Sequence, residues 1–184
     1  MFRTTMLSAL AVASLCVAGS AGAQTAPQGA PAGTDPMMMP TTAPDYVKAA
    51  GAGDKFEIDS SKLVLQSTKD AQVRSFAHKM IADHTKSTAM VKVAARKDGV
   101  AVMPPMLNPM QTQMLDDIRA ATGKARDAVY MQDQGTSHDA SLQVQQSYAS
   151  GGDKPALMAT AAKIVPVVQS HIDMLNAMPK TAAM

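Results

Sequence analysis

Apolar residues recur at the spacing of helices that bury one face in five stretches of the chain. The helices that they predict cover residues 45–68, 70–98, 110–122, 125–150 and 154–178. The pattern is clearest in the second stretch, whose apolar face is formed by Val73, Phe76, Ala77, Met80, His84, Ser87, Thr88, Val91, Ala94 and Ala95. His84 is the unusual member of this face, because a titratable ring seldom lies among apolar side chains.

Residues that favour helix ends mark the boundaries of these stretches. Asp70 is a good N-cap for the second helix, and Asp153 is expected to cap the last one. Gly99 follows the second helix as its C-terminal glycine. Three prolines between positions 100 and 109 predict a loop, and Pro166 predicts a kink within the last helix.

Four long helices and one short helix predict an all-α protein. We expect one four-helix bundle in up-down-up-down order, with residues 110–122 as a short crossover helix. The bundle domain is predicted to cover residues 44–179, and a domain of about 135 residues is large enough to bury one core.

The start of the chain has the pattern of a secretory signal rather than of a folded element. Arg3 precedes a short apolar run, which ends in the small residues Ala21-Gly22-Ala23. We predict a signal peptide over residues 1–23, with cleavage after Ala23, and a periplasmic or secreted product. The run is shorter than the ~20 apolar residues that span a bilayer, so no stable membrane anchor is expected after cleavage. Residues 24–43 predict a disordered linker rich in Pro, Ala and Met, and 180–184 a tail.

Composition narrows the chemistry. The single cysteine, Cys16, leaves with the signal, so neither a disulfide nor a thiolate ligand is expected. The formal net charge is only +2, the charges are mixed, and the chain has three Tyr, three Phe and no Trp. Nucleic-acid binding is therefore not expected, because it needs a basic surface and often stacking rings.

Each long helix carries one ionisable residue on its inward face: Glu57, His84, His138 and His171. If both tight hairpins lie at one end of the bundle, helix rise places Glu57, His84 and His138 at about the same height. His171 is then expected about one turn away, and Asp54 and Tyr130 lie near the same layer.

Two interpretations of this layer remain open. A third possibility is that these side chains do not come together at all. In the first, a buried polar network fixes the helix register: a histidine donates to Glu57 or an aspartate and accepts from Tyr130, while Asp127 pairs with Tyr130. In the second, Glu57, His84, His138 and His171 bind zinc, copper or iron. A ferritin-type di-iron centre is not expected, because Glu57 is the only glutamate of the chain.

The remaining ionisable residues and the methionines give weaker indications of a site. His78 and Asp83 fall off the inward faces and suit a solvated surface, where Asp83 is expected to form a surface pair or to cap a neighbour. Methionines near the predicted loop favour a helix that covers the bundle over thioether ligands for Cu(I). They are Met103, Met106, Met110 and Met114. No glycine elbow or oxyanion device supports a hydrolase, and no catalytic residue is predicted.

Several local motifs match a known family. They are Glu57, Phe76-Ala77-x-x-Met80-x-x-Asp83-His84-Thr85, Asp127-x-x-Tyr130-Met131, His138, Pro166 and His171, together with the signal peptide. From Asp45 to about Met178 the chain resembles the exported bacterial family of domains of unknown function numbered four-one-four-two. The resemblance implies a ferritin-like helical bundle without an assigned reaction. Arg126 departs from the family, which often has Phe there, and is expected to loosen the core.

Together these observations predict an exported helical-bundle domain that is not an enzyme, with a binding role or an envelope- or stress-related role. The alternative is a periplasmic metal-binding or redox protein that uses the inward histidines and Glu57. Neither a substrate nor a partner follows from the sequence.

Overall fold

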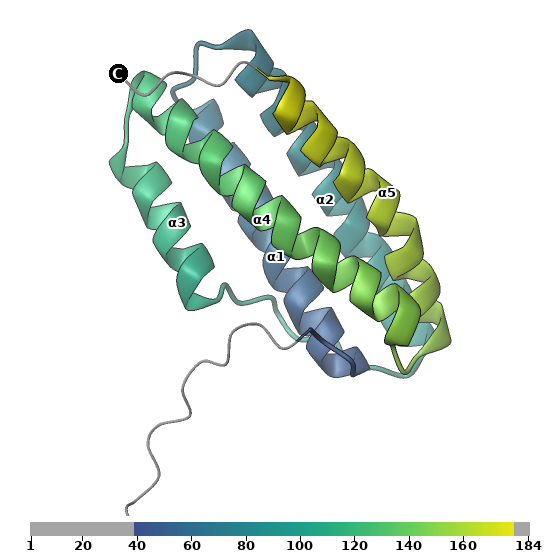
Figure 1. Ribbon diagram of the computed structural model, residues 1–184. Helices are drawn as coiled ribbons and strands as arrows, with labels where there is room; N and C mark the ends of the chain where they lie inside the picture. Colours follow the sequence, from purple (N-terminus) through teal and green to yellow (C-terminus); the bar gives the residue numbers. More distant parts are fainter. Residues whose placement is uncertain (1–38, 179–184) are drawn as a thin grey trace, which may run out of the picture. The chain divides into compact units, whose positions relative to one another are not determined.

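The computed structural model describes residues 39–178; the predicted signal peptide, most of the linker and the 180–184 tail lie outside the described residues. Within this range the protein consists of helices without strands, which confirms the all-α prediction (Figure 1). The helices are α1 (Ala43–Leu65), α2 (Ala71–Lys97), α3 (Pro109–Ala120), α4 (Gly123–Gly151) and α5 (Pro155–Ala177). None of them combines the length and apolar character needed to cross a membrane.

The four long helices form a bundle in which each has two long neighbours. α1 packs against α2 and α4, and α5 packs against the same two helices, while α3 lies across α1 and α4 (Figure 1). Gly99 adopts a φ of 70° directly after α2, which is why a glycine ends this helix. The four-helix bundle with a short crossover helix is therefore as predicted.

The order of helix directions differs from the expected up-down-up-down order. Thr68, in the α1–α2 hairpin, donates to Asp127 at the start of α4 over 3.0 Å. Tyr46, at the start of α1, donates to Gln145 near the end of α4 over 2.7 Å. The two tight hairpins therefore lie at opposite ends of the bundle, and the order is up-down-down-up. The physical reason is that α3 runs back along the bundle before α4 begins (Figure 1).

The cap of α5 also differs from the prediction. Asp153 does not cap this helix but accepts a hydrogen bond from the Tyr148 hydroxyl over 2.9 Å. The carboxylate of Asp98, at the end of α2, instead accepts from the backbone nitrogens of Ala156 and Leu157 over 3.2 and 2.8 Å. A side chain from another helix thus satisfies the free N–H groups of the first turn.

α3 packs on the bundle through a face on which only one methionine takes part. Its buried side chains are Gln111, Leu115 and Ile118, and the partly buried Met114 packs against the core, while Met110 is 44% exposed. A reciprocal capping box between Asn108 and Gln111 fixes the start of the helix.

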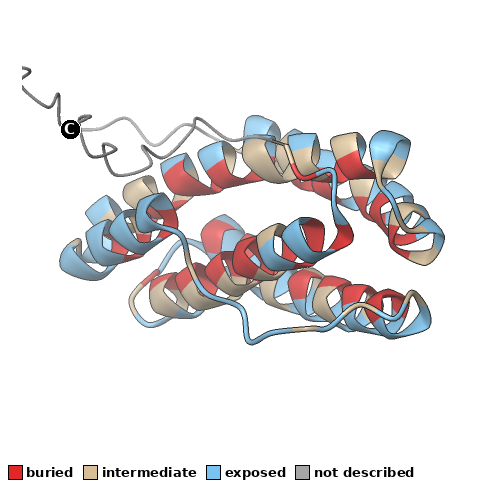
Figure 2. Ribbon diagram, turned by 90° about the horizontal axis from the view of Figure 1, so that it is seen from below, coloured by how far each residue is buried: buried red, intermediate tan, exposed pale blue. Residues whose placement is uncertain are grey.

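The buried residues lie on the sides of the helices that face the interior of the bundle (Figure 2), and the apolar ones form two clusters. One cluster surrounds Tyr46, Tyr148 and Leu157, and the other surrounds Phe56, Phe76 and Tyr130. Between them along every long helix comes a buried polar layer, which contains Asp54, Glu57, His84, His138 and His171. A polar layer that divides a core replaces apolar contacts, which suggests that it serves a purpose besides folding.

A row of hydrogen bonds joins α1 to α4 along the bundle. The pairs are Tyr46 with Gln145, Glu57 with Ser137, Ser60 with Gln134, Ser61 with Tyr130 and Thr68 with Asp127. Because each donor meets its partner only in one alignment, these bonds fix the register of the two helices. Arg126 does not loosen the core as expected: it donates to the Ala121 carbonyl and the Ser67 hydroxyl over 2.8 and 3.1 Å.

Candidate metal centre

Three buried histidines from three different helices meet in the polar layer. His84 of α2, His138 of α4 and His171 of α5 each offer one ring nitrogen within 4.8 Å of the others. Their ring centroids lie 5.3–5.6 Å apart, and the rings are at most 5% exposed. His171 therefore lies in the layer itself, not one turn away as the helix-rise estimate predicted, because that estimate counted from Gly152, whereas it is Ala156 that lies level with the end of α2 through its bond to Asp98.

Each ring has one nitrogen that faces away from the cluster, called here the outer nitrogen, and one that faces the other two rings, the inner nitrogen. An oxygen acceptor holds the outer nitrogen of each ring. His84 Nδ1 lies 2.8 Å from Asp54 Oδ1, His138 Nδ1 lies 2.8 Å from the Gln134 carbonyl, and His171 Nε2 lies 2.9 Å from Asp83 Oδ2. Carbonyl and carboxylate oxygens only accept hydrogen bonds, so each of these nitrogens carries the hydrogen. This assignment fixes the tautomer of every neutral ring in the cluster.

The inner nitrogens then carry lone pairs that point at one another. His138 Nε2 and His171 Nδ1 are 3.2 Å apart, and His84 Nε2 is buried without a hydrogen-bond partner in the described part of the chain. Two facing lone pairs repel unless a proton or a metal ion lies between them. An imidazole that donates its outer N–H to a carboxylate or carbonyl, with its other nitrogen free, is the usual arrangement of a metal-bound histidine.

The surroundings shift the pKa values of two rings in opposite directions. Burial and, to a smaller extent, the neighbouring histidines lower the pKa of His171 to about 4, despite the hydrogen bond to Asp83. Burial also lowers the pKa of His84, but the Asp54 hydrogen bond and nearby carboxylates outweigh it, so the pKa is raised overall. A positive charge within the cluster is therefore best placed on His84, and His171 stays neutral and able to coordinate at neutral pH.

Glu57 lies in the layer but outside the histidine cluster. Its Oε1 accepts from the Ser137 hydroxyl over 2.5 Å and lies 3.7 Å from His138 Nδ1, the outer nitrogen of that ring. Among the described residues, the three histidines offer ligand atoms close enough to one another to share a metal ion, and Glu57 is not part of this group. The geometry thus brings together three of the four predicted ligands and places the carboxylate behind one of them.

Tyr130 and Asp127 have other partners than the predicted network gives them. Tyr130 shares a hydrogen bond of 2.9 Å with Ser61, and Asp127 accepts from Thr68. Neither side chain bonds to a histidine or to the other one within residues 39–178. Both belong to the α1–α4 register contacts, and the expected pairing of Asp127 with Tyr130 is wrong.

The sequence analysis missed two residues that position the cluster. Asp83 forms the expected surface pair with Lys79, but its Oδ2 also accepts from His171 of α5. Asp54 was expected in the layer without a role, and it holds both His84 and Thr88, over 2.8 and 2.9 Å. Burial raises the pKa of Asp83, whereas hydrogen bonds from Lys79 and His171 lower it below its usual range, so this carboxylate is ionised.

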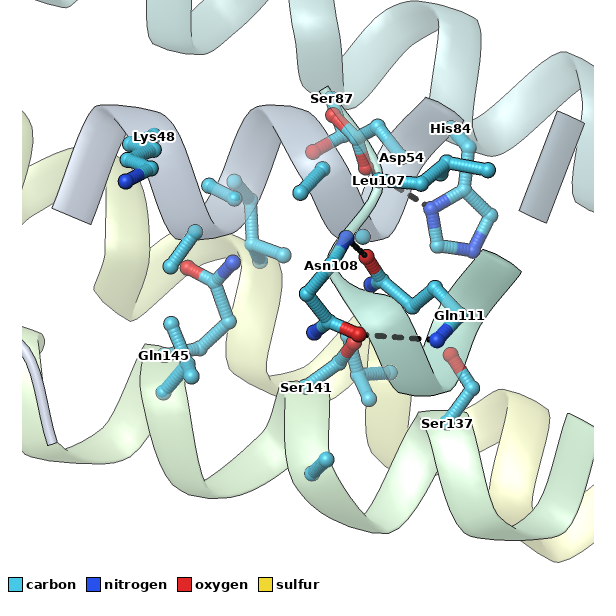
Figure 3. A pocket seen from close by; sticks show the side chains of 18 of the residues that line it. Lys48, Asp54, His84, Ser87, Leu107, Asn108, Gln111, Ser137, Ser141 and Gln145 are labelled. Atoms are coloured by element: carbon cyan, nitrogen blue, oxygen red, sulfur yellow. Dashed lines mark hydrogen bonds and ion pairs between the residues drawn. The ribbon is translucent and has the colours of Figure 1, made fainter. Parts of the chain in front are cut away.

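A cavity of about 490 Å³ reaches the histidines from the side of α3. His84 and His171 line it, whereas His138 does not. Near its mouth, the backbone nitrogen of Asn108 donates to the Gln111 side chain and the backbone nitrogen of Gln111 donates to the Asn108 side chain, over 3.0 and 2.8 Å (Figure 3). The cavity therefore extends to two of the three histidines, while His84 Nε2 itself is buried.

Comparison with protein families identifies the chain. The model of the domain of unknown function DUF4142 matches residues 26–178, which is most of the sequence. The chain belongs to the DUF4142 family. This confirms the resemblance drawn from the motifs around His84 and Tyr130. No curated protein matches the chain.

Solved structures share the fold of this DUF4142 domain. A secreted DUF305 protein from Streptomyces coelicolor, 14% identical, superposes with a TM-score of 0.62 over 73% of this chain and 90% of its own. Structures described as CopM in Cu(I)-bound and Cu(II)-bound forms are 13% and 15% identical, with TM-scores of 0.60 and 0.61. Each covers 74% of this chain and 94% of its own. At such identities the similarity is one of fold.

Proposed function

We propose that this DUF4142 domain binds one first-row transition metal ion through His84, His138 and His171. The observation that carries the proposal is the convergence of three ring nitrogens whose opposite nitrogens are all held by oxygen acceptors. Three imidazoles with an open fourth position suit zinc or copper, with metal–nitrogen distances of about 2.0–2.1 Å.

Copper(II) is the ion expected to bind most tightly among divalent ions, because nitrogen sites follow the order in which Cu²⁺ exceeds Zn²⁺ and the earlier metals. That two solved neighbours are described as copper-bound supports the choice of copper as the first metal to test. When bound, the ion would supply an open coordination position. The protein's residues hold the three rings and keep their tautomers.

Titration of the full, metal-free chain with Cu(II) and Zn(II), followed by calorimetry and native mass spectrometry, tests the proposal. The wild-type protein and the His78→Ala variant, whose histidine is exposed, are expected to bind one ion per chain. His84→Ala, His138→Ala and His171→Ala are expected to lose it while circular dichroism shows that they keep their helices. Glu57→Gln is expected to keep it. Equal binding by His84→Ala and wild type would overturn the proposal.

A second role, as a non-catalytic binding or envelope domain, is favoured by the row of bonds between α1 and α4. In this case the polar layer serves only to fix helix register. Ligand linkage distinguishes the two roles, because an ion that binds only the folded state at a hundred times its dissociation constant adds about 2.7 kcal/mol of stability. An unchanged melting temperature with saturating metal would favour the register role. Export through the 1–23 signal remains part of the proposal, and N-terminal sequencing of the mature protein tests it.

A further inference from the structure

The mouth of the cavity carries an unusual set of side chains. Met106, Met110 and Met114 line the cavity whose inner wall includes His84 and His171. Met106 is 75% exposed and Met110 is 44% exposed. Large apolar side chains left in solvent at the mouth of a polar site point to a ligand that thioethers recognise.

Two of these methionines do not attach α3 to the bundle. Leu115 and Ile118, both at most 8% exposed, attach it together with the partly buried Met114. Met110 and Met114 are four residues apart in α3 and share a side of the helix, whereas Met106 lies in the loop before it. The prediction that the methionines cover the bundle therefore accounts for Met114 but not for the exposed Met106 and Met110 at the cavity.

The backbone around the methionines is held in place. The Asn108–Gln111 capping box fixes the turn between Met106 and Met110 (Figure 3), and Pro109 restricts the backbone at the first residue of the helix. A fixed backbone lowers the entropic cost of bringing several flexible side chains to one ion.

We propose that Met106, Met110 and Met114 form a capture site for Cu(I) at the mouth of the cavity, ahead of the histidine cluster. Thioether sulfurs are soft, neutral ligands that select Cu(I) over Zn(II) and other divalent ions, whereas imidazoles accept both classes. Cation capture is also helped by the carboxylates of Asp54 and Asp83, which line the same cavity. The inference deepens the proposed function by naming the oxidation state that enters, but the capture site itself does not need the histidines.

The test measures monovalent and divalent ions separately on the full chain. Under anaerobic conditions, Cu(I) is titrated in competition with a chromogenic Cu(I) chelator, and Ag(I) serves as a monovalent probe that does not change oxidation state. The variant combines Met106→Leu, Met110→Leu and Met114→Leu, which keep the side-chain size and apolar character. The matched control is Met103→Leu, because Met103 is 75% exposed and is not among the residues that line the cavity.

The triple variant is expected to lose one equivalent of Ag(I), or to bind Cu(I) at least about tenfold more weakly, while its Zn(II) binding and that of Met103→Leu stay unchanged. His84→Ala is expected to retain the Ag(I) equivalent that the methionines bind. Unchanged Ag(I) and Cu(I) binding in the triple variant would overturn the capture site, and so would its loss in His84→Ala. Loss of Zn(II) binding alone would count against the histidine cluster and not against the methionine site, so the two proposals fail separately.

Discussion

His138 Nε2 and His171 Nδ1 lie 3.2 Å apart, although the opposite nitrogen of each ring already donates to an oxygen. Between two neutral rings held in this way there is no hydrogen to form a bond. Two lone pairs therefore face each other in the metal-free protein, and a cation that both rings coordinate would relieve their repulsion. This relationship distinguishes the cluster from an ordinary buried histidine, whose two nitrogens both find complementary partners.

The tautomers of the metal-free protein follow from these contacts. We expect His138 to carry its hydrogen on Nδ1 and His171 on Nε2 at neutral pH. Because burial lowers the pKa of His171 to about 4, this ring should remain neutral as the pH falls through 6 and 5. Long-range ¹H–¹⁵N spectra of the full chain measure both properties. A His171 ring that is protonated at pH 6, or a hydrogen on His138 Nε2, would contradict the assignment.

The carboxylates behind the rings should tune metal affinity without coordinating the ion. Asp83→Asn removes the charge that holds His171, and Asp54→Asn does the same for His84, so each should weaken metal binding by about 10–100-fold. Asp59→Asn is the matched control, because Asp59 pairs with Lys55 on the surface and contacts none of the three histidines among the described residues. Metal competition assays measure the three variants. Unchanged affinity in both aspartate variants would show that these hydrogen bonds do not support the site.

Asp133 is expected to destabilise the folded protein once its carboxylate is ionised, so its contribution to stability falls as the pH rises. Burial and the charge of Asp117 raise its pKa to about 6, and its Oδ2 has no partner among the described residues. Its ionised form is thus favoured by unfolding, and stability is lost as the pH rises from about 4 through 6. Asp133→Asn should stabilise the protein by about 1–2 kcal/mol at pH 7.5 and by almost nothing at pH 4. Urea unfolding at both pH values measures this.

The control for that experiment is Asp139→Asn, on the exposed side of the same helix. Its stability should follow that of the wild type at both pH values. An Asp133→Asn variant that gained nothing at pH 7.5, or that gained equally at pH 4, would show that this carboxylate is not destabilised by burial.

Asp98 is expected to contribute to stability from the end of a different helix. Asp98→Ala leaves the backbone nitrogens of Ala156 and Leu157 without their acceptor, which should cost about 1 kcal/mol, as loss of an N-cap does. Thermal unfolding compares this variant with Asp139→Ala, which removes a carboxylate without such contacts. A cost no larger than that of the control would show that solvent replaces the cap.

The sequence predicted the helices and the members of the layer because both follow from local periodicity. His84, His138 and His171 fall on inward faces, and all three come together. The height estimate placed His138 in the right layer although it assumed the wrong helix directions, because His138 lies near the middle of α4 and has a similar distance to either end. The height of His171 was predicted wrongly because it was counted from Gly152, whereas Ala156 is the residue that lies level with Asp98 at the end of α2.

What the sequence did not predict depends on contacts between helices. Asp83 lies next to His84 in the chain and points elsewhere, so only the approach of α5 reveals that it holds His171. Glu57 has the right height but faces Ser137 and the outer side of His138, and height alone cannot give a direction around the helix. The cap of α5 by Asp98 likewise joins residues 58 positions apart.

Anomalous diffraction from crystals of the full chain loaded with Cu(II) or Zn(II) tests the central claim most directly. The account predicts one strong peak about 2.0–2.2 Å from His84 Nε2, His138 Nε2 and His171 Nδ1. Loaded crystals that show no peak among these three nitrogens, or an ion held only by exposed residues such as His78, would contradict it.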